Sequence, residues 1–334
     1  DFGPAASPAA GSTTPTLTAE ADNTNWAVSR SISITAKGGG TLKYRKSDAT
    51  SWTMLTSNAT NYSLNRSVTE NGYYTFLLTT GDITITKTVL VERIDRENPT
   101  ASIGELTSAS TQSPKSGVYT KLVLPITYAD TGSGVNTVQY SWTNSTATPT
   151  SWTTLGKNAT TVTYTASEST PTAKYLHIWV LDGVGNTCET YSSSYTVISQ
   201  TAVKNHTPTI TITGAPTKWT NDTATLNWKL SNDSGKNYEV ILPDGKTSKN
   251  SSGEVWARQN GDYTVTVRDL DYGGENTAAI KVDKLDFIPP TVTVSGLNGW
   301  SKDNQTVTIT ASDAQSGVGE KWYKIVSNNK EAPA

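Results

Sequence analysis

Apolar and polar residues alternate with a period of two in many short segments of this chain. Ser31–Thr35, Asp82–Thr86 and Asp262–Val267 follow this pattern, which is typical of a strand with one buried and one solvent-facing side. Turn residues separate such segments every 8–12 residues or so, and no helical segment supplies a crossover between parallel strands. Asn71-Gly72 and Asn260-Gly261 mark tight turns before strands rich in aromatic residues. The pattern therefore predicts an all-β protein made of antiparallel β-sandwiches.

Repeated segments show that the chain is modular. Three pairs correspond: Ser51–Leu55 with Ser151–Leu155, Lys218–Leu226 with Gly299–Val307, and Asp130–Val135 with Asp313–Val318. Repeats at such distances are typical of several domains of one fold in tandem.

Proline-containing stretches mark the boundaries between these modules. Ile94–Thr100 and Val282–Thr291 each end one alternating strand and start another, and Thr201–Pro208 is a third boundary of this kind. Proline is tolerated at the first residue of an edge strand because its missing N–H need not pair there. The predicted organisation is a linker at 1–13, immunoglobulin-like domains at 14–96, 97–203 and 204–288, and an incomplete domain at 289–334.

Charge and hydropathy argue against two classes of function. The formal net charge is -2 and no block of like charge stands out, whereas a nucleic-acid-binding domain would present a basic stripe. No apolar run approaches the length of about 20 residues that a membrane-spanning helix needs. The single cysteine, Cys188, cannot form a disulfide within the chain, and we expect it to be a partly buried strand residue.

One segment carries a family resemblance. Gly261–Val292 contains a turn, the strand Gly-Asp-Tyr-Thr-Val-Thr-Val-Arg-Asp, Gly-Gly-Glu-Asn, a last strand, and Val-Asp-Lys before Pro-Pro-Thr-Val. It resembles bacterial immunoglobulin-like repeats of the Big type, and Trp179–Asn186 resembles their Asp-x-x-Gly-Asn hairpin. The third domain departs from the repeated Asp-x-x-Ser-Gly-Val motif, with only Asp233–Gly235. The resemblance, which covers nearly all of the chain after residue 14, implies tandem immunoglobulin-like β-sandwich domains in an elongated array.

Candidate catalytic residues are few. The chain has two histidines, of which His177 alternates with apolar residues in a strand and is expected to face solvent, while His206 lies in a linker. No Gly-x-Ser-x-Gly nucleophile elbow is present, and no cluster of Asp and Glu suggests paired carboxylates. The family of the resemblance also brings no catalytic residues. We therefore expect no catalytic site and no enzymatic activity.

Spaced acids suggest one metal site. Asp269, Asp271 and Glu275 have the spacing of a calcium loop, but an EF-hand would need a Glu where Ile280 stands. A looser calcium site and a solvated hairpin turn are the two interpretations. Asp130 and Asp313 are expected to be Asx-turn residues before a glycine. No cofactor other than calcium is suggested.

Ten tryptophans are the other candidate binding residues. Trp52, Trp152 and Trp256 are candidates for stacking on sugar rings, set against an ordinary packing role. Trp142, Trp179 and Trp228 fall within strands and are expected in the core.

These observations predict a non-catalytic spacer, stalk or adhesive repeat region of a bacterial cell-surface protein, located outside the cell. The alternatives are a carbohydrate-binding array accessory to a secreted glycan-degrading enzyme, an S-layer subunit and a phage tail decoration. Expected partners are a host-surface or cell-wall glycan or protein, or neighbouring copies of the same protein, with no nucleic acid and no membrane insertion in this segment.

The C-terminal segment supplies three predicted strands, at Thr291–Val294, Thr306–Thr310 and Lys321–Val326. Three strands leave one sheet of a sandwich without its partner, so Val307, Ile309 and Ile325 would face water. We expect the native protein to continue past Ala334, or another chain to donate the missing strands.

Overall fold

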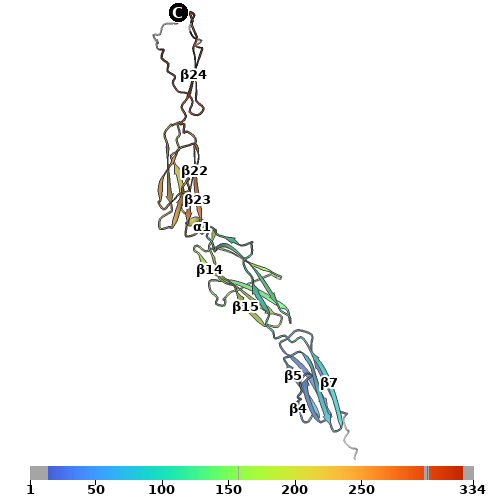
Figure 1. Ribbon diagram of the computed structural model, residues 1–334. Coiled ribbons are helices and arrows are strands. Elements are labelled where there is room, and N and C mark those ends of the chain that lie inside the picture. The colour runs from blue at the N-terminus through green and yellow to red at the C-terminus, as the bar shows by residue number, and fades with distance from the viewer. Residues whose placement is uncertain (1–13, 157, 297–298, 300, 326–334) are drawn as a thin grey trace, which may run out of the picture. The chain divides into compact units, whose positions relative to one another are not determined.

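The computed structural model describes residues 14–156, 158–296, 299 and 301–325, and the expected linker at 1–13 lies outside them. Within the described part, almost all regular structure is β-strand, and the one helix is α1 at Gln200–His206 (Figure 1). None of the described helical structure is long and apolar enough to cross a membrane. The prediction of an all-β protein is confirmed.

The first sandwich consists of two antiparallel sheets. Their strand orders are β1-β2-β5 and β4-β3-β6-β7, which is the A-B-E and C′-C-F-G arrangement of immunoglobulin-like domains. The strands are β1 (Thr16–Ala21), β2 (Arg30–Lys37), β3 (Thr41–Lys46), β4 (Thr53–Thr56), β5 (Asn61–Val68), β6 (Gly72–Thr80) and β7 (Ile83–Val91).

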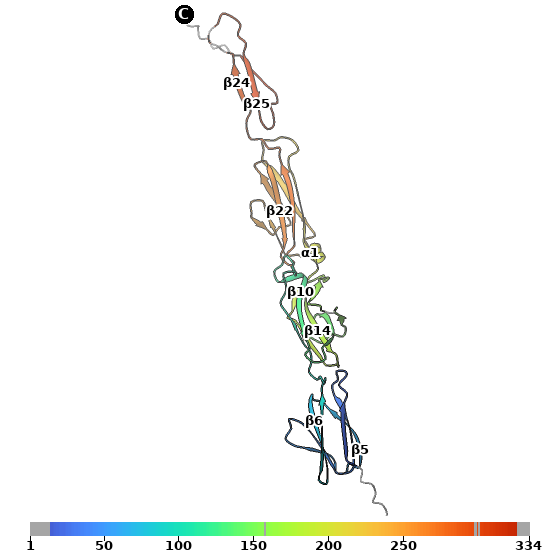
Figure 2. The ribbon, with the colours of Figure 1, turned by 90° about the vertical axis from the view of Figure 1, so that its right-hand side faces the viewer.

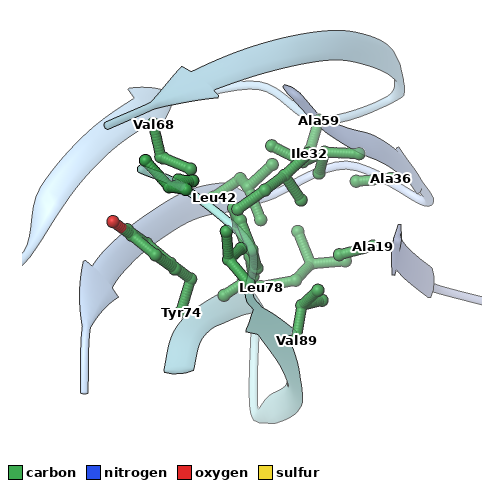
Figure 3. Packing of buried hydrophobic residues seen from close by; sticks show 13 residues of the cluster. Ala19, Ile32, Ala36, Leu42, Ala59, Val68, Tyr74, Leu78 and Val89 are labelled. Carbon is green, nitrogen blue, oxygen red and sulfur yellow. The ribbon is translucent and has the colours of Figure 1, made fainter. Parts of the chain in front are cut away.

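Alternation along each strand builds the core of this sandwich. In β2, Ile32 and Ile34 are buried and Ser33 between them is exposed, as the sequence pattern predicts. They meet Leu42, Phe76 and Leu78 of the opposite sheet in one cluster, shown in Figure 3. Each such side chain contributes about 1.5–3 kcal/mol when it is fully buried.

A tyrosine corner marks the start of strand F in two sandwiches. The Tyr74 hydroxyl donates to the carbonyl oxygen of Glu70 at 3.0 Å, and Tyr263 donates to Gln259 at 3.0 Å. A tyrosine that bonds back to the chain a few residues upstream is a hallmark of immunoglobulin-like folds.

The strands of the second sandwich form one continuous nine-stranded sheet, in which β8-β10-β13 and β12-β11-β14-β15 correspond to the two sheets of the first sandwich and β9 pairs with β10. The additional strand β16 lies between β14 and β10 and joins the sheets at one end. The strands are β8 (Thr100–Ile103), β9 (Thr111–Gln112), β10 (Val118–Ala129), β11 (Val135–Thr143), β12 (Thr153–Thr154), β13 (Thr161–Thr165), β14 (Thr172–Asp182), β15 (Thr187–Tyr191) and β16 (Tyr195–Val197).

The third sandwich repeats the topology of the first, with orders β17-β18-β21 and β20-β19-β22-β23. Its core contains Leu226, Trp228 and Val265. The strands are β17 (Thr209–Thr213), β18 (Ala224–Ser231), β19 (Tyr238–Ile241), β20 (Thr247–Ser248), β21 (Ser252–Ala257), β22 (Gly261–Asp269) and β23 (Glu275–Val282).

The described C-terminal part forms a two-stranded hairpin of β24 (Thr291–Ser295) and β25 (Thr308–Ser312), which Figure 2 shows side by side. Val307, Ile309 and Ile325 are exposed, as expected. The third predicted strand is wrong for residues 321–325, which form no strand, and Val326 lies outside the described residues. A lone hairpin gives an apolar strand too little surface to pack against.

The chain folds into two compact units. The first contains the described residues up to Thr111 and those within Lys121–Thr165 and Thr172–Val197. The second contains Gln112–Thr120, Ala166–Pro171 and the described residues from Ile198 onward. The first unit thus holds the first sandwich and the body of the second, while one end of the second sandwich groups with the third.

Candidate functional site

The segment after β7 is fixed by a bridge and an asparagine clamp. Ile94 is buried and forms an isolated parallel bridge with Ala27. The Asn71 side chain donates to the Ile94 carbonyl oxygen and accepts from the Ile94 N–H, both at 2.8 Å. These contacts place the next residue, Asp95, at the start of the second sandwich.

Asp95 joins this segment to a turn of the second sandwich. Its carboxylate is buried, and Oδ2 accepts from the Ser133 N–H at 2.6 Å while Oδ1 accepts from the Glu97 N–H at 3.2 Å. A Cβ on Gly132 would lie 2.3 Å from Asp95 Cγ, so in this latch the turn packs directly against the carboxylate. We call the Asp95–Ser133 pair, and its repeat described next, the linker latch.

The same arrangement returns after the third sandwich. Leu285 forms an isolated parallel bridge with Thr220. The Asn260 side chain donates to the Leu285 carbonyl oxygen at 2.8 Å and accepts from the Leu285 N–H at 2.9 Å. Asp286 Oδ2 then accepts from the Ser316 N–H at 3.0 Å. Hydrogen bonds from Ser316 lower the pKa of Asp286, with a further contribution from the Ile288 N–H. The linker latch is therefore built twice from corresponding residues.

The turns that meet the two latches are closed by their own aspartates. Asp130 Oδ2 accepts from the N–H groups of Gly132 and Gly134, at 3.1 and 2.7 Å. Asp313 Oδ1 accepts from Gln315 and Gly317 in the same way, at 2.9 and 3.1 Å. The Asx-turn prediction for both aspartates is confirmed.

A different junction connects the second and third sandwiches. Thr201–Pro208, predicted as a linker, is mostly helix α1, capped where the Ser199 hydroxyl accepts from the Ala202 N–H at 3.1 Å. At the end of α1, His206 Nδ1 lies 2.7 Å from Asp269 Oδ2. The His206 ring also stacks on Tyr272, with centroids 4.0 Å apart.

Apolar contacts reinforce this junction within the second compact unit. Val118, Ile198 and Val203 form a small buried cluster with Tyr272 against it. The Lys115 ammonium donates to the carbonyl oxygen of Asp271 in the turn of the third sandwich. The junction thus combines a small core with polar contacts.

The structure brings together only part of the predicted calcium set. Asp269 and Asp271 group with His206, each offering a ligand atom within 4.8 Å of the others. Glu275 instead pairs with Arg268, with Oε1 at 2.6 Å from Nε. The structure does not bring Glu275 to the other two, because Glu275 belongs to strand β23, where it faces Arg268 of the neighbouring strand.

The acidic oxygens in this turn already accept hydrogen bonds from the backbone. Asp269 Oδ1 accepts from the N–H groups of Asp271 and Tyr272, at 2.9 and 3.2 Å. Asp271 Oδ2 accepts from the Asn237 N–H at 3.2 Å. We therefore interpret Asp269 and Asp271 as residues that stabilise this turn by accepting hydrogen bonds from backbone N–H groups.

A second acidic group consists of Asp95, Asp130 and Asp182. Asp182 caps its own hairpin, as Oδ1 accepts from the N–H groups of Val184, Gly185 and Asn186 at 2.7–2.9 Å. Burial acts to raise the pKa of Asp182, but these hydrogen bonds together outweigh it and the pKa is lowered.

Two of the three candidate tryptophans are covered by neighbours. The guanidinium of Arg45 lies over the Trp52 ring at 4.8 Å. Trp152 packs against Trp179 and edge-on to His177, with ring centroids 6.5 and 6.4 Å apart. In contrast, Trp256 is 61% exposed and lines a groove of the third sandwich.

Two expectations for the second sandwich are wrong. His177 is fully buried, although solvent exposure was predicted, because Ser145 and its neighbours between β11 and β12 cover it. His177 Nε2 contacts the Ser145 carbonyl oxygen at 3.1 Å, and Nδ1 contacts Glu189 Oε1 at 3.2 Å. Trp179, predicted in the core, lies on the same outer face of β14 as His177.

The remaining strand residues behave as predicted. Trp228 is buried in the core of the third sandwich, and Trp142 packs against the core of the second. Cys188 lies partly buried in β15, and burial raises the pKa of its thiol.

No family model and no curated protein matches this chain. Among solved structures, it is similar to the FN1–FN3 domains of chicken CNTN1, at 12% identity with 80% of this chain and 98% of that chain covered and a TM-score of 0.26. It is also similar to BcpA, the major pilin subunit of Bacillus cereus, at 13% identity, 80% and 95% coverage and a TM-score of 0.20. At these TM-scores the fold assignment rests on the strand orders.

Proposed function

We propose that this chain is a non-catalytic spacer, stalk or adhesive repeat region of a bacterial cell-surface protein, built of immunoglobulin-like repeats of the Big type. The observation that carries the proposal is the linker latch, which occurs twice with corresponding residues. A spacer must transmit position and load from one domain to the next, and the latch is a contact suited to that task.

The latch differs from a flexible tether in its burial. Asp95 and Asp286 are 4% and 7% exposed, and each carboxylate accepts two backbone N–H groups. Breaking the contact at Asp95 leaves a buried carboxylate without one of its hydrogen bonds, at a free energy of about 1–3 kcal/mol. A flexible linker is instead rich in glycine and serine and leaves its backbone to water.

The outer faces of the strands also suit a region surrounded by solvent. In β18, exposed residues alternate strictly with buried ones, and the exposed set is Thr225, Asn227, Lys229 and Ser231. A polar outer face keeps sandwiches from associating through their flat sides. An extracellular position and a glycan, protein or second copy of the chain as partner are part of this proposal.

Single-molecule force spectroscopy of the full chain tests the load-bearing role. A spacer of sandwiches that each have their own core predicts separate unfolding steps, each releasing about 3.3–3.6 Å per residue of the sandwich that unfolds. A smooth extension without steps would contradict a load-bearing role. Turnover in a glycosidase and peptidase screen, lost on heat unfolding, would contradict the non-catalytic part.

A further inference from the structure

Trp256 stands at a position where the other two sandwiches carry small polar residues. In the third sandwich, the antiparallel pairing of β18 with β21 begins at Ala224 and Ala257, and Trp256 is paired with Thr225 at the next position. Ser67 occupies the corresponding place in the first sandwich. Thr165 occupies it in the second, opposite Lys121. The fold therefore does not require an aromatic residue here.

The exposed ring borders a groove at an open side of the third sandwich. Strand β21, which carries Trp256, is the edge strand of its sheet. The groove has a volume of about 660 Å³ and is bordered by the turn after β19 and the start of β22. Its other lining includes Leu242, Pro243 and Tyr263.

Charged groups of both signs share this groove with the aromatic ring. Asp244 and Lys246 form an ion pair at 2.9 Å on one side. Glu254 and Arg258 lie on the strand side, and within the described residues neither side chain has a hydrogen bond or an ion pair. Their hydrogen-bonding capacity is directed to solvent or to a ligand.

We propose that this groove binds a neutral oligosaccharide of equatorially linked pyranose rings. The C–H face of such a ring is apolar and packs flat on an aromatic face, here that of Trp256. The sugar hydroxyls both donate and accept, which matches unpaired Glu254 and Arg258. The mixed charge of the lining disfavours a strongly anionic or cationic ligand.

Trp256 differs from Trp52 and Trp152, the two other candidates for stacking on sugar rings, in how much of its ring is accessible. Trp52 has a guanidinium over its ring and Trp152 packs with Trp179 and His177, so both rings are partly covered, whereas Trp256 is 61% exposed. The inference goes beyond the spacer role, which would stand even if the groove bound nothing.

Nuclear magnetic resonance on the 15N-labelled full chain tests the site through the tryptophan indole N–H signals. The probes are cellohexaose and hexa-N-acetylchitohexaose, two neutral β-1,4-linked hexasaccharides. Trp256→Thr, which installs the residue of the second sandwich, assigns the Trp256 signal and should leave the rest of the spectrum unchanged. We expect a saturable shift of the Trp256 signal with at least one probe, at the millimolar affinity of a small shallow site.

One further variant and one reference signal make the outcome decisive. Arg258→Ala should weaken binding by about three- to tenfold, the effect of losing one hydrogen bond. The indole signal of Trp26, which is 41% exposed but outside the groove, should not move. An unmoved Trp256 signal with both probes, or equal shifts of Trp256 and Trp26, would overturn the proposal.

Discussion

The carboxylate of Asp95 accepts a hydrogen bond from the backbone N–H of Ser133 at 2.6 Å, across the start of the second sandwich. The corresponding pair after the third sandwich, Asp286 and Ser316, is 3.0 Å apart. Each aspartate follows a buried apolar residue held by an asparagine clamp, Ile94 in the first case and Leu285 in the second. The end of one sandwich thus holds a turn of the next module, the turn between β10 and β11 in the first case and the turn after β25 in the second.

Gly132→Ala should destabilise the first latch. The new Cβ would lie 2.3 Å from Asp95 Cγ, so either the turn or the carboxylate must shift. We expect a loss of about 1–3 kcal/mol in unfolding free energy, as for other overpacked sites, measured by urea unfolding. Gly156→Ala is the matched control because no atom lies within 4 Å of its Cβ. Equal effects of the two substitutions would argue against the close approach.

Acid should weaken the hairpin that Asp182 caps. The folded-state pKa of Asp182 lies below its ordinary value of 3.8, so folding favours the ionised form. This stabilisation is complete above the ordinary pKa and is lost as the pH falls through the lowered folded pKa. The difference in unfolding free energy between the unsubstituted chain and Asp182→Asn should therefore shrink below about pH 4. A difference that stays constant into acid would contradict this assignment.

Tyr74→Phe should lower the stability of the first sandwich, and Tyr73→Phe should not. The Tyr74 hydroxyl donates to Glu70 from a buried position, whereas Tyr73 is 56% exposed. Loss of the corner hydrogen bond should cost about 0.5–1.5 kcal/mol in thermal unfolding. The adjacent variant controls for removal of a hydroxyl from the same strand, and a similar loss in both would show that the corner contributes nothing specific.

His177→Ala should release the segment between β11 and β12. The imidazole contacts the Ser145 carbonyl oxygen and Glu189, and neither partner is replaced when the ring is removed. We expect a destabilisation of about 1–3 kcal/mol and faster limited proteolysis at residues 144–151. His206→Ala, which removes the other histidine, should leave proteolysis at these residues unchanged.

Strand patterning was predictable because each sandwich buries one face of each sheet. Ile32 and Ile34 alternate with serine and threonine, and this order specifies both the strand and its buried side. His177 shows the limit of the method. Alternation placed it correctly on the outer face of β14, but not under the covering segment around Ser145, because that contact joins residues far apart in the sequence.

Helix α1 and the linker latches differ in whether the sequence alone could have predicted them. Helix α1 could have been found, since Ser199 before Ala202 and Val203 is an N-cap signal. The linker latch could not have been predicted, because Asp95 and Asp286 resemble ordinary linker aspartates until the positions of Ser133 and Ser316 are known. Among the site residues, only exposure separated Trp256 from Trp52 and Trp152, and exposure depends on what neighbours cover each ring.

The most direct test of the spacer account is the distance distribution between the first and second sandwiches. Spin labels at Thr86→Cys and Thr163→Cys, in a Cys188→Ser background, would be measured by double electron–electron resonance in the full chain, with Asp95→Ala as the variant and Asp82→Asn as the control. A working latch predicts one narrow distribution that Asp95→Ala broadens and Asp82→Asn does not. Equally broad distributions in all three folded proteins would contradict the claim that the linker latch couples successive sandwiches.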